Sequence, residues 1–265
     1  FTTEFSKNDV RITTKYIEED LTSNLYSVVH EGGHAMYELS VDDALIHSPL
    51  GHGATTAIHE SQSRLWENGI GRRFSFCRLI FPKIKELFPR QMEGVSAEDF
   101  FRAVNRAQPS LIRTDADELT YSLHVLVRYE IEKKIFHDEI SVEELPAEWN
   151  RLYKEYLGID VPDDTRGVLQ DAHWADGAFG YFPSYALGTA YSAQIMASLR
   201  KAVDVDRCCE RGNFAEVRDW LTEKIYRHGM LLTAEQLIEN ACGEAFDPSY
   251  YTDYLTEKFT GLYRL

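Results

Sequence analysis

Residues 21–39 read LTSNLYSVVHEGGHAMYEL, and this stretch decides the fold and the chemistry that we expect. Its apolar residues Tyr26, Val29, Met36 and Leu39 recur at the spacing of one helical face. We therefore predict one continuous helix over the whole stretch.

The centre of this helix carries the motif His30-Glu31-Gly32-Gly33-His34. At 3.6 residues per turn, the two histidines differ by about 40° around the axis and ~6 Å along it, so both rings can reach one divalent ion. Glu31 then lies beside the metal, where a carboxylate acts as general base in H-E-x-x-H peptidases. Such a motif arises by chance in roughly three chains of this length in a hundred, so it needs a third ligand as support.

A glutamate on a following helix would complete the site, because His2Glu is a standard ligand set for catalytic zinc. A second His-Glu pair, His59-Glu60, opens a helical stretch over residues 60–67 after a glycine-containing loop. We therefore predict His30, His34 and Glu60 as the metal ligands.

Gly32 and Gly33 argue against a purely structural helix with two solvated histidines. Each glycine costs about 0.5–1 kcal/mol relative to alanine in a helix interior. We expect the pair to allow the close approach of another backbone.

The composition predicts a folded chain that does not bind nucleic acid. With 265 residues, 44% of them hydrophobic, the chain can bury a substantial core as one large domain or two small ones. Its formal charge is −15, its pI is near 5.0, and its basic residues are scattered, so a phosphate backbone would be repelled.

The cysteines and the chain start predict a cytoplasmic protein. Cys77, Cys208, Cys209 and Cys242 form no C-x-x-C pair and no disulfide framework, which favours reduced thiols. No apolar run reaches the ~18–20 residues of a membrane-spanning helix, and no signal peptide is recognisable. Because the chain begins without methionine on a segment that reads as structured, we expect upstream residues to have been removed.

Helix signals dominate the rest of the chain. Capping patterns predict helix starts at Ser96, Ser141, Asn213 and Thr233, and the helix after Asn213 should end near His228-Gly229. A further helix is predicted from Asp115 to Lys134.

Only two segments are strand candidates, Val10 to Lys15 and the aromatic-rich residues 180–187. We expect a mainly α fold with a small antiparallel sheet.

Five motifs in order resemble the thermostable carboxypeptidase Taq family of metallocarboxypeptidases, which carry the H-E-x-x-H signature. The motifs are D-x-R-x-T at residues 9–13, H-E-x-x-H at 30–34, H-E-S-Q at 59–62, I-R-x-x-A-D at 112–117 and G-x-x-Q-D-x-H-W at 167–174. The resemblance extends over essentially all of residues 1–265.

The resemblance implies a neurolysin-like and angiotensin-converting-enzyme-like helical fold. It implies zinc, or sometimes cobalt, held by His30, His34 and Glu60, with Glu31 as general base. Family members are typically cytosolic homodimers about twice this length, and their N-terminal helical half is missing here. Residues 1–265 would therefore form the catalytic, C-terminal half of a longer family protein.

Three arginines, Arg113, Arg64 and Arg11, are considered for substrate binding. A carboxypeptidase must recognise a free α-carboxylate, and the guanidinium of Arg113 offers a bidentate partner for it. The alternative for Arg113 is a salt bridge to Asp115, Asp117 or another acid, and Arg64 could serve as the anchor instead. Arg11 lies on the strand that borders the cleft in the family, although an ion pair with Asp9 that fixes the turn explains the same residue and is the interpretation that we favour slightly.

A loop-like aromatic stretch offers donors for a developing oxyanion. We predict His173 and Tyr185 as catalytic residues and Tyr181 as a substrate-binding second choice, since related peptidases use a histidine and a tyrosine from such a region. Each tyrosine could instead be a packed aromatic with a satisfied hydroxyl. Asp117 and Glu118 could accept hydrogen bonds from the ligand histidines, or could be solvated helix charges.

The function that we predict is hydrolysis of the C-terminal peptide bond by a metal-activated water, with Glu31 as general base. The substrates would be peptides with a free C-terminus. One alternative is an endopeptidase or dipeptidase with the same metal chemistry. The other is a catalytically silent fragment that needs its N-terminal half.

Overall fold

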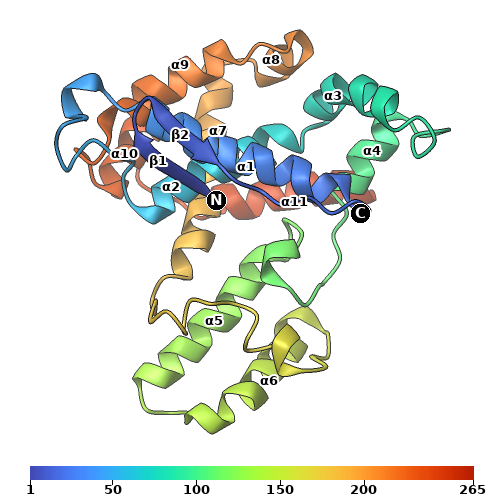
Figure 1. The fold of residues 1–265 in the computed structure, drawn as a ribbon, viewed down its shortest axis with the longest axis vertical. Helices are drawn as coiled ribbons and strands as arrows, with labels where there is room; N and C mark the ends of the chain where they lie inside the picture. The colour runs from blue at the N-terminus through green and yellow to red at the C-terminus, as the bar shows by residue number, and fades with distance from the viewer. The chain divides into compact units, whose positions relative to one another are not determined.

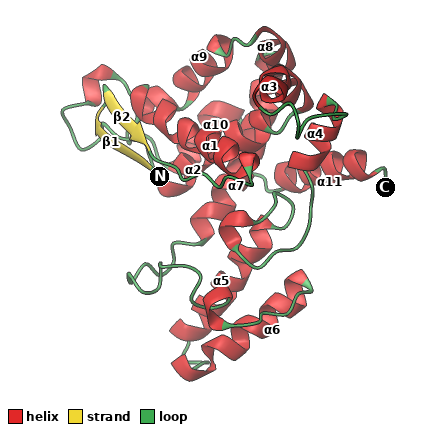
Figure 2. Cartoon of the chain, turned by 45° about the vertical axis from the view of Figure 1, so that its right-hand side comes forward, coloured by secondary structure: helices red, strands yellow, loops and turns green.

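The computed structural model describes all 265 residues and confirms a mainly α-helical fold with one two-stranded antiparallel sheet. Figure 2 shows the hairpin as the only strands among helices and loops. The chain divides into two compact units. The first unit comprises Phe1–Val104 and Gly188–Leu265, and the second comprises Asn105–Leu187.

The hairpin that opens the first unit packs against the metal-motif helix. β1 (Thr2–Ser6) pairs with β2 (Asp9–Ile12), with Thr3 opposite Arg11 and Glu4 opposite Val10. Both strands contact α1 (Leu21–Leu39), as Figure 1 shows. The predicted strand from Val10 to Lys15 is therefore correct only in its first half.

Helix α1 has the bounds that the apolar spacing predicted. The side chain of Asp20 accepts hydrogen bonds from the backbone amides of Thr22 and Ser23, which satisfies two of the amides that lack helical partners at the N-terminus. α1 packs along α2 (Thr56–Arg64), whose N-cap is Thr55. The loop between the two helices contains a short 3₁₀ turn, Asp43–Leu45.

Helix α2 continues into a π-helical segment, η2 (Leu65–Gly71). π-helical turns are rare and often occur at functional sites. Both segments are buried. The hydroxyls of Ser61 and Ser63 each donate a hydrogen bond to the backbone carbonyl three residues earlier. The predicted helix over residues 60–67 is thus confirmed and lies deep in the first unit.

The remaining helices of the first unit surround this pair. They are α3 (Phe74–Leu87), α4 (Ala97–Val104), α7 (Pro183–Ala202, which begins in the second unit), α8 (Val205–Arg211), α9 (Ala215–Lys224), α10 (Ala234–Cys242) and α11 (Ser249–Tyr263). A 3₁₀ turn follows α9 at Tyr226–His228. The core includes Ile58, Leu65, Ile195, Leu221 and Leu237, all with no exposed surface.

The predicted caps are largely confirmed. Thr233 and Ser141 form capping boxes with Gln236 and Glu144, and Ser96 exchanges hydrogen bonds with Asp99. The helix predicted after Asn213 instead ends at Lys224, four residues before the predicted stop, and the chain continues as the 3₁₀ turn.

The second unit is built on α5 (Tyr121–Phe136) and α6 (Leu145–Leu157), which enclose a core around Trp149, Tyr153 and Ile131. It also contains 3₁₀ turns at Arg113–Asp115, Val142–Glu144 and Asp164–Arg166. The predicted helix start at Asp115 is wrong by six residues. Asp117 accepts hydrogen bonds from the backbone amides of Leu119 and Thr120, and this local turn competes with helix formation.

The strand candidate at residues 180–187 is also wrong, because residues from Pro183 onward form the start of α7. Gly180 has a positive φ of 73°, which turns the chain, and the fixed φ of Pro183 suits the first turn of a helix. None of the helices combines the length and the apolar composition that a membrane-spanning segment needs.

Candidate metal centre

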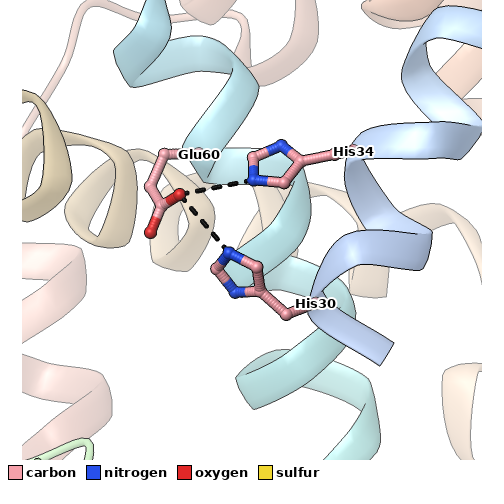
Figure 3. Close-up of side chains that lie close together, drawn as sticks. All are labelled: His30, His34 and Glu60. Carbon is pink, nitrogen blue, oxygen red and sulfur yellow. Dashed lines mark ion pairs between the residues drawn. The ribbon is translucent and has the colours of Figure 1, made fainter. Parts of the chain in front are cut away.

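Two adjacent helices bring three potential metal ligands together. The Nε2 atoms of His30 and His34, on α1, lie 3.6 and 3.5 Å from the same oxygen, Oε2 of Glu60 on α2. All three ligand atoms lie within 4.8 Å of one another. Figure 3 shows both rings directed at this carboxylate oxygen.

The geometry and chemistry of this cluster fit a tetrahedral divalent ion. Bonds of about 2.0–2.1 Å at tetrahedral angles would place neighbouring ligand atoms about 3.4 Å apart, close to the two observed separations. Two imidazole nitrogens and a carboxylate leave a fourth position for water or substrate. The ligand set is therefore of the kind found in catalytic zinc sites.

One of the two motif glycines makes this close approach feasible. A Cβ on Gly33 would lie 2.7 Å from the carbonyl oxygen of Gln62 and 2.7 Å from Cα of Ser63, so α1 and α2 touch there through their backbones. A Cβ on Gly32 would meet nothing within 4 Å. The expectation of close backbone approach is thus confirmed for Gly33 and wrong for Gly32.

A third helix approaches the site at a glycine that the sequence analysis did not single out. A Cβ on Gly188 of α7 would lie 2.7 Å from Cβ of Glu60 and 2.9 Å from the carbonyl oxygen of Ala57. The candidate ligand Glu60 is therefore enclosed between α1 and α7, with 4% of its surface exposed.

Both candidate ligand histidines, His30 and His34, use their second ring nitrogen for a hydrogen bond. Nδ1 of His30 lies 3.0 Å from Oε2 of Glu67, and Nδ1 of His34 lies 2.6 Å from Nδ1 of His59. These bonds direct each Nε2 toward Glu60, as metal-binding histidines require.

Glu67 and His59 were not predicted for this role, for which Asp117 and Glu118 were the candidates. Asp117 and Glu118 belong to the second unit, where Asp117 caps local backbone amides and Glu118 is buried. The sequence spacing could have indicated Glu67, because it follows Glu60 by about two helical turns and so lies on the same side of the helix.

Two arginines, Arg64 and Arg72, compensate the negative charge of the buried carboxylates Glu60 and Glu67. Nε of Arg64 lies 2.8 Å from Oε1 of Glu60, and its Nη1 lies 3.1 Å from Glu67, which also pairs with Arg72 at 3.2 Å. Burial opposes ionisation of Glu60 and Glu67, but Arg64 and the neighbouring histidines outweigh it and hold the pKa of both carboxyls far below the usual range. Both groups are therefore charged and available to a cation or its ligands.

Glu31, the candidate general base, follows His30 on α1. Its Oε2 accepts a hydrogen bond of 2.6 Å from the hydroxyl of Thr2 on β1, and 14% of its side chain is exposed. The hairpin thus fixes one carboxylate oxygen of Glu31.

Arg113 lies in the second unit, in a buried ion-pair network. Its Nε and Nη2 lie 3.1 and 2.8 Å from Oδ1 of Asp171, and its Nη1 donates to the hydroxyl of Tyr121. Arg128 pairs with the other oxygen of Asp171 at 2.6 Å. The salt bridge weighed as the alternative for Arg113 is therefore observed, with Asp171 as the partner instead of Asp115 or Asp117.

The predicted oxyanion donors lie together in the second unit. Nε2 of His173 is 3.1 Å from the hydroxyl of Tyr185, and the ring centroid of Tyr181 is 5.5 Å from that of His173. Burial, followed by the charge of Arg113, lowers the pKa of His173, so its ring is neutral at pH 7.

The other substrate-binding candidate, Arg11, forms the predicted ion pair with Asp9. Two hydrogen bonds of 2.7 Å join the side chains, and 66% of the Arg11 side chain is exposed. This pair explains both residues as parts of the hairpin.

Comparison with known proteins finds a family of metallopeptidases. The family model of carboxypeptidase Taq (M32) metallopeptidases matches residues 1–259. The chain is 47% identical over its full length to Carboxypeptidase 1 of Bacillus subtilis (strain 168) and 41% identical over 98% of its length to Thermostable carboxypeptidase 1 of Pyrococcus furiosus. It covers 53% and 52% of these proteins, so it spans about half the length of the curated relatives that it matches.

The fold also matches solved structures. The M32 carboxypeptidase from Deinococcus radiodurans R1 superimposes with a TM-score of 0.97 at 43% identity over 100% of this chain and 54% of the other. Metallocarboxypeptidase 1 of Trypanosoma cruzi gives a TM-score of 0.91 at 39% identity, over 96% and 53% of the two chains.

Proposed function

The chain belongs to the carboxypeptidase Taq (M32) family of metallopeptidases, and we propose that it provides the metal-dependent centre of a carboxypeptidase. The observation that carries this proposal is the convergence of His30 and His34 on one oxygen of Glu60. We propose zinc as the metal, with cobalt as a substitute, because the donor set is His2Glu.

In the proposed mechanism, a bound divalent ion would polarise the scissile carbonyl and acidify a water molecule. Glu31 takes the proton from the attacking water and passes it to the leaving amine. The hydroxyl of Thr2 holds Oε2 of Glu31, and Oε1, which lies 3.5 Å from the N-terminal nitrogen of Phe1, is the oxygen that we propose for proton transfer. His30, His34 and Glu60 keep their positions throughout because their other polar atoms are already hydrogen-bonded.

We further propose that His173 and Tyr185 donate hydrogen bonds to the oxyanion. Nε2 of His173 and the hydroxyl of Tyr185 lie 3.1 Å apart, so an oxyanion bound between them would replace their mutual hydrogen bond. Replacing Tyr185 by phenylalanine should lower kcat more than it changes KM, because the contact forms only in the transition state.

The proposed contacts of the substrate carboxylate involve Arg113, Tyr181 and Arg11. Arg113 has the weakest support, since all three of its guanidinium nitrogens already donate to Asp171 or Tyr121. Tyr181 and Arg11 are more exposed and could reach a peptide.

The decisive experiment compares a short peptide with a free C-terminus and the same peptide amidated at its C-terminus. A carboxypeptidase should release residues one at a time from the free acid only, and only with zinc or cobalt present. Glu31→Gln should abolish turnover while the bound metal stays near one ion per chain. Equal cleavage of both peptides would favour the endopeptidase alternative, and bound metal without any cleavage would favour the silent fragment.

We also propose a reducing, cytoplasmic environment and a homodimer. All four cysteines are free thiols, which supports the reducing compartment. The homodimer follows from the family resemblance, and sedimentation of the purified protein would test it.

A further inference from the structure

His59 precedes the ligand Glu60 on α2, yet its ring joins two residues of the other metal-binding helix. Its Nδ1 lies 2.6 Å from Nδ1 of His34, and its Nε2 lies 2.7 Å from Oε1 of Glu38. Glu38 follows His34 by four residues on α1, so both face the same side of that helix. A chain of hydrogen bonds therefore leaves α1 at His34, crosses to α2 at His59 and returns to α1 at Glu38.

The direction of each hydrogen bond follows from the role of His34. Its Nε2 faces Glu60, and Figure 3 shows its other ring nitrogen directed away from that carboxylate. A ligand that uses Nε2 carries its proton on Nδ1, which must then donate to Nδ1 of His59. His59 in turn carries its proton on Nε2 and donates to Glu38. One tautomer of each ring satisfies the whole chain.

The loop before α2 packs against this chain of hydrogen bonds. The amide of Gly53 donates to Oε1 of Glu38 at 2.9 Å, and a Cβ at position 53 would lie 2.7 Å from Cδ2 of His59 and 2.9 Å from Oε1 of Glu38. The ring of Tyr37 lies 5.1 Å from that of His59, and its hydroxyl accepts a bond from the amide of Ala54. Glycine at position 53 thus leaves the space that His59 and Glu38 occupy.

We propose that His59 and Glu38 are positioning residues that hold His34 in the orientation and tautomer needed for metal binding. The proposal rests on the metal site proposed above and gives a role to the first residue of the His59–Gln62 motif. Most metal-binding histidines donate directly to a carboxylate or carbonyl. Here a second histidine is inserted between the ligand and the carboxylate, and it ties α2 to α1 at the metal.

The test measures zinc affinity of the purified chain by competition with a chromophoric chelator. His59→Leu removes the acceptor for His34 and should weaken zinc binding about 10- to 100-fold. His59→Asn places an amide oxygen near the position of Nδ1 and should recover most of that loss. His137→Leu, which removes an exposed histidine at the end of α5, is the control and should leave the affinity unchanged.

A double-mutant cycle separates a relay from two independent contacts. Because Glu38 acts on His34 only through His59, the pair His59→Leu and Glu38→Leu should lose little more affinity than His59→Leu alone. Circular dichroism of the metal-free variants checks that each is folded, and His59→Asn carries the test if a leucine variant is not.

Three results would overturn the relay. These are wild-type affinity in His59→Leu, equal losses in folded His59→Leu and His59→Asn, and additive losses in the double variant. A wild-type chain that binds no zinc would overturn the metal site itself, so the two failures are distinguishable.

Discussion

Replacing Gly33 by alanine should push helices α1 and α2 apart, whereas the same change at Gly32 should not. The new methyl group at position 33 would lie 2.7 Å from backbone atoms of Gln62 and Ser63, which have no rotamer that could yield. Restoring an ordinary contact of about 3.4 Å requires α1 to retreat by about 0.7 Å. That shift would carry His34 from 3.5 Å to about 4 Å from Glu60, too far for one tetrahedral ion.

The two substitutions should change the free energy of unfolding in opposite directions. Alanine improves helix formation by about 0.5–1 kcal/mol at either position. At Gly33, overpacking against the α2 backbone costs about 1–3 kcal/mol and outweighs this gain. We therefore expect Gly33→Ala to lower the free energy of unfolding by about 1–2 kcal/mol and Gly32→Ala to raise it by about 0.5–1 kcal/mol.

The assay is urea unfolding of the metal-free proteins, followed by zinc titration of each. Gly33→Ala should also bind zinc more weakly than the wild type, while Gly32→Ala should bind it equally well. If Gly33→Ala were as stable as Gly32→Ala and bound zinc normally, the backbones of α1 and α2 would not touch at this point.

Three further predictions concern the metal, a buried ion pair and pH. Removing the metal with a chelator should lower the melting temperature, and zinc at 100 times its dissociation constant should restore about 2.7 kcal/mol of stability, as calorimetry can check. Asp171→Ala leaves Arg113 and Arg128 buried without their carboxylate, so urea unfolding should show a loss of about 3–5 kcal/mol; a loss below 1 kcal/mol would contradict the network. Burial, followed by the charges of Arg128 and Arg113, lowers the pKa of His124 to about 3. The unfolded chain therefore takes up this proton below about pH 6.5 while the folded chain does not, so stability should fall by up to about 1.4 kcal/mol per unit as pH drops from 6.5 toward 3. The decline should be shallower in His124→Leu, and identical slopes would count against a buried neutral ring.

Local features of the chain could be predicted from the sequence. Helix α1 begins and ends where its apolar spacing indicated, and Ser141 and Thr233 cap helices as their patterns predicted. Each of these features depends on residues within one or two helical turns, so no distant partner is needed. The same holds for His30 and His34, which one helix brings to the same face.

Other features depended on residues far apart in the sequence. Residues 183–187 have the composition of a strand, yet without a pairing strand they begin a helix. Gly32 and Gly33 are indistinguishable in sequence, and only the path of α2 distinguishes their roles.

The sequence by itself determined the helix, its two histidines and the family to which the chain belongs. Only the tertiary structure decided which groups surround them: Glu67 on His30, and His59 with Glu38 on His34. Local propensity and periodicity act along one segment, whereas a hydrogen bond between segments is set by a distance that no spacing in the sequence encodes.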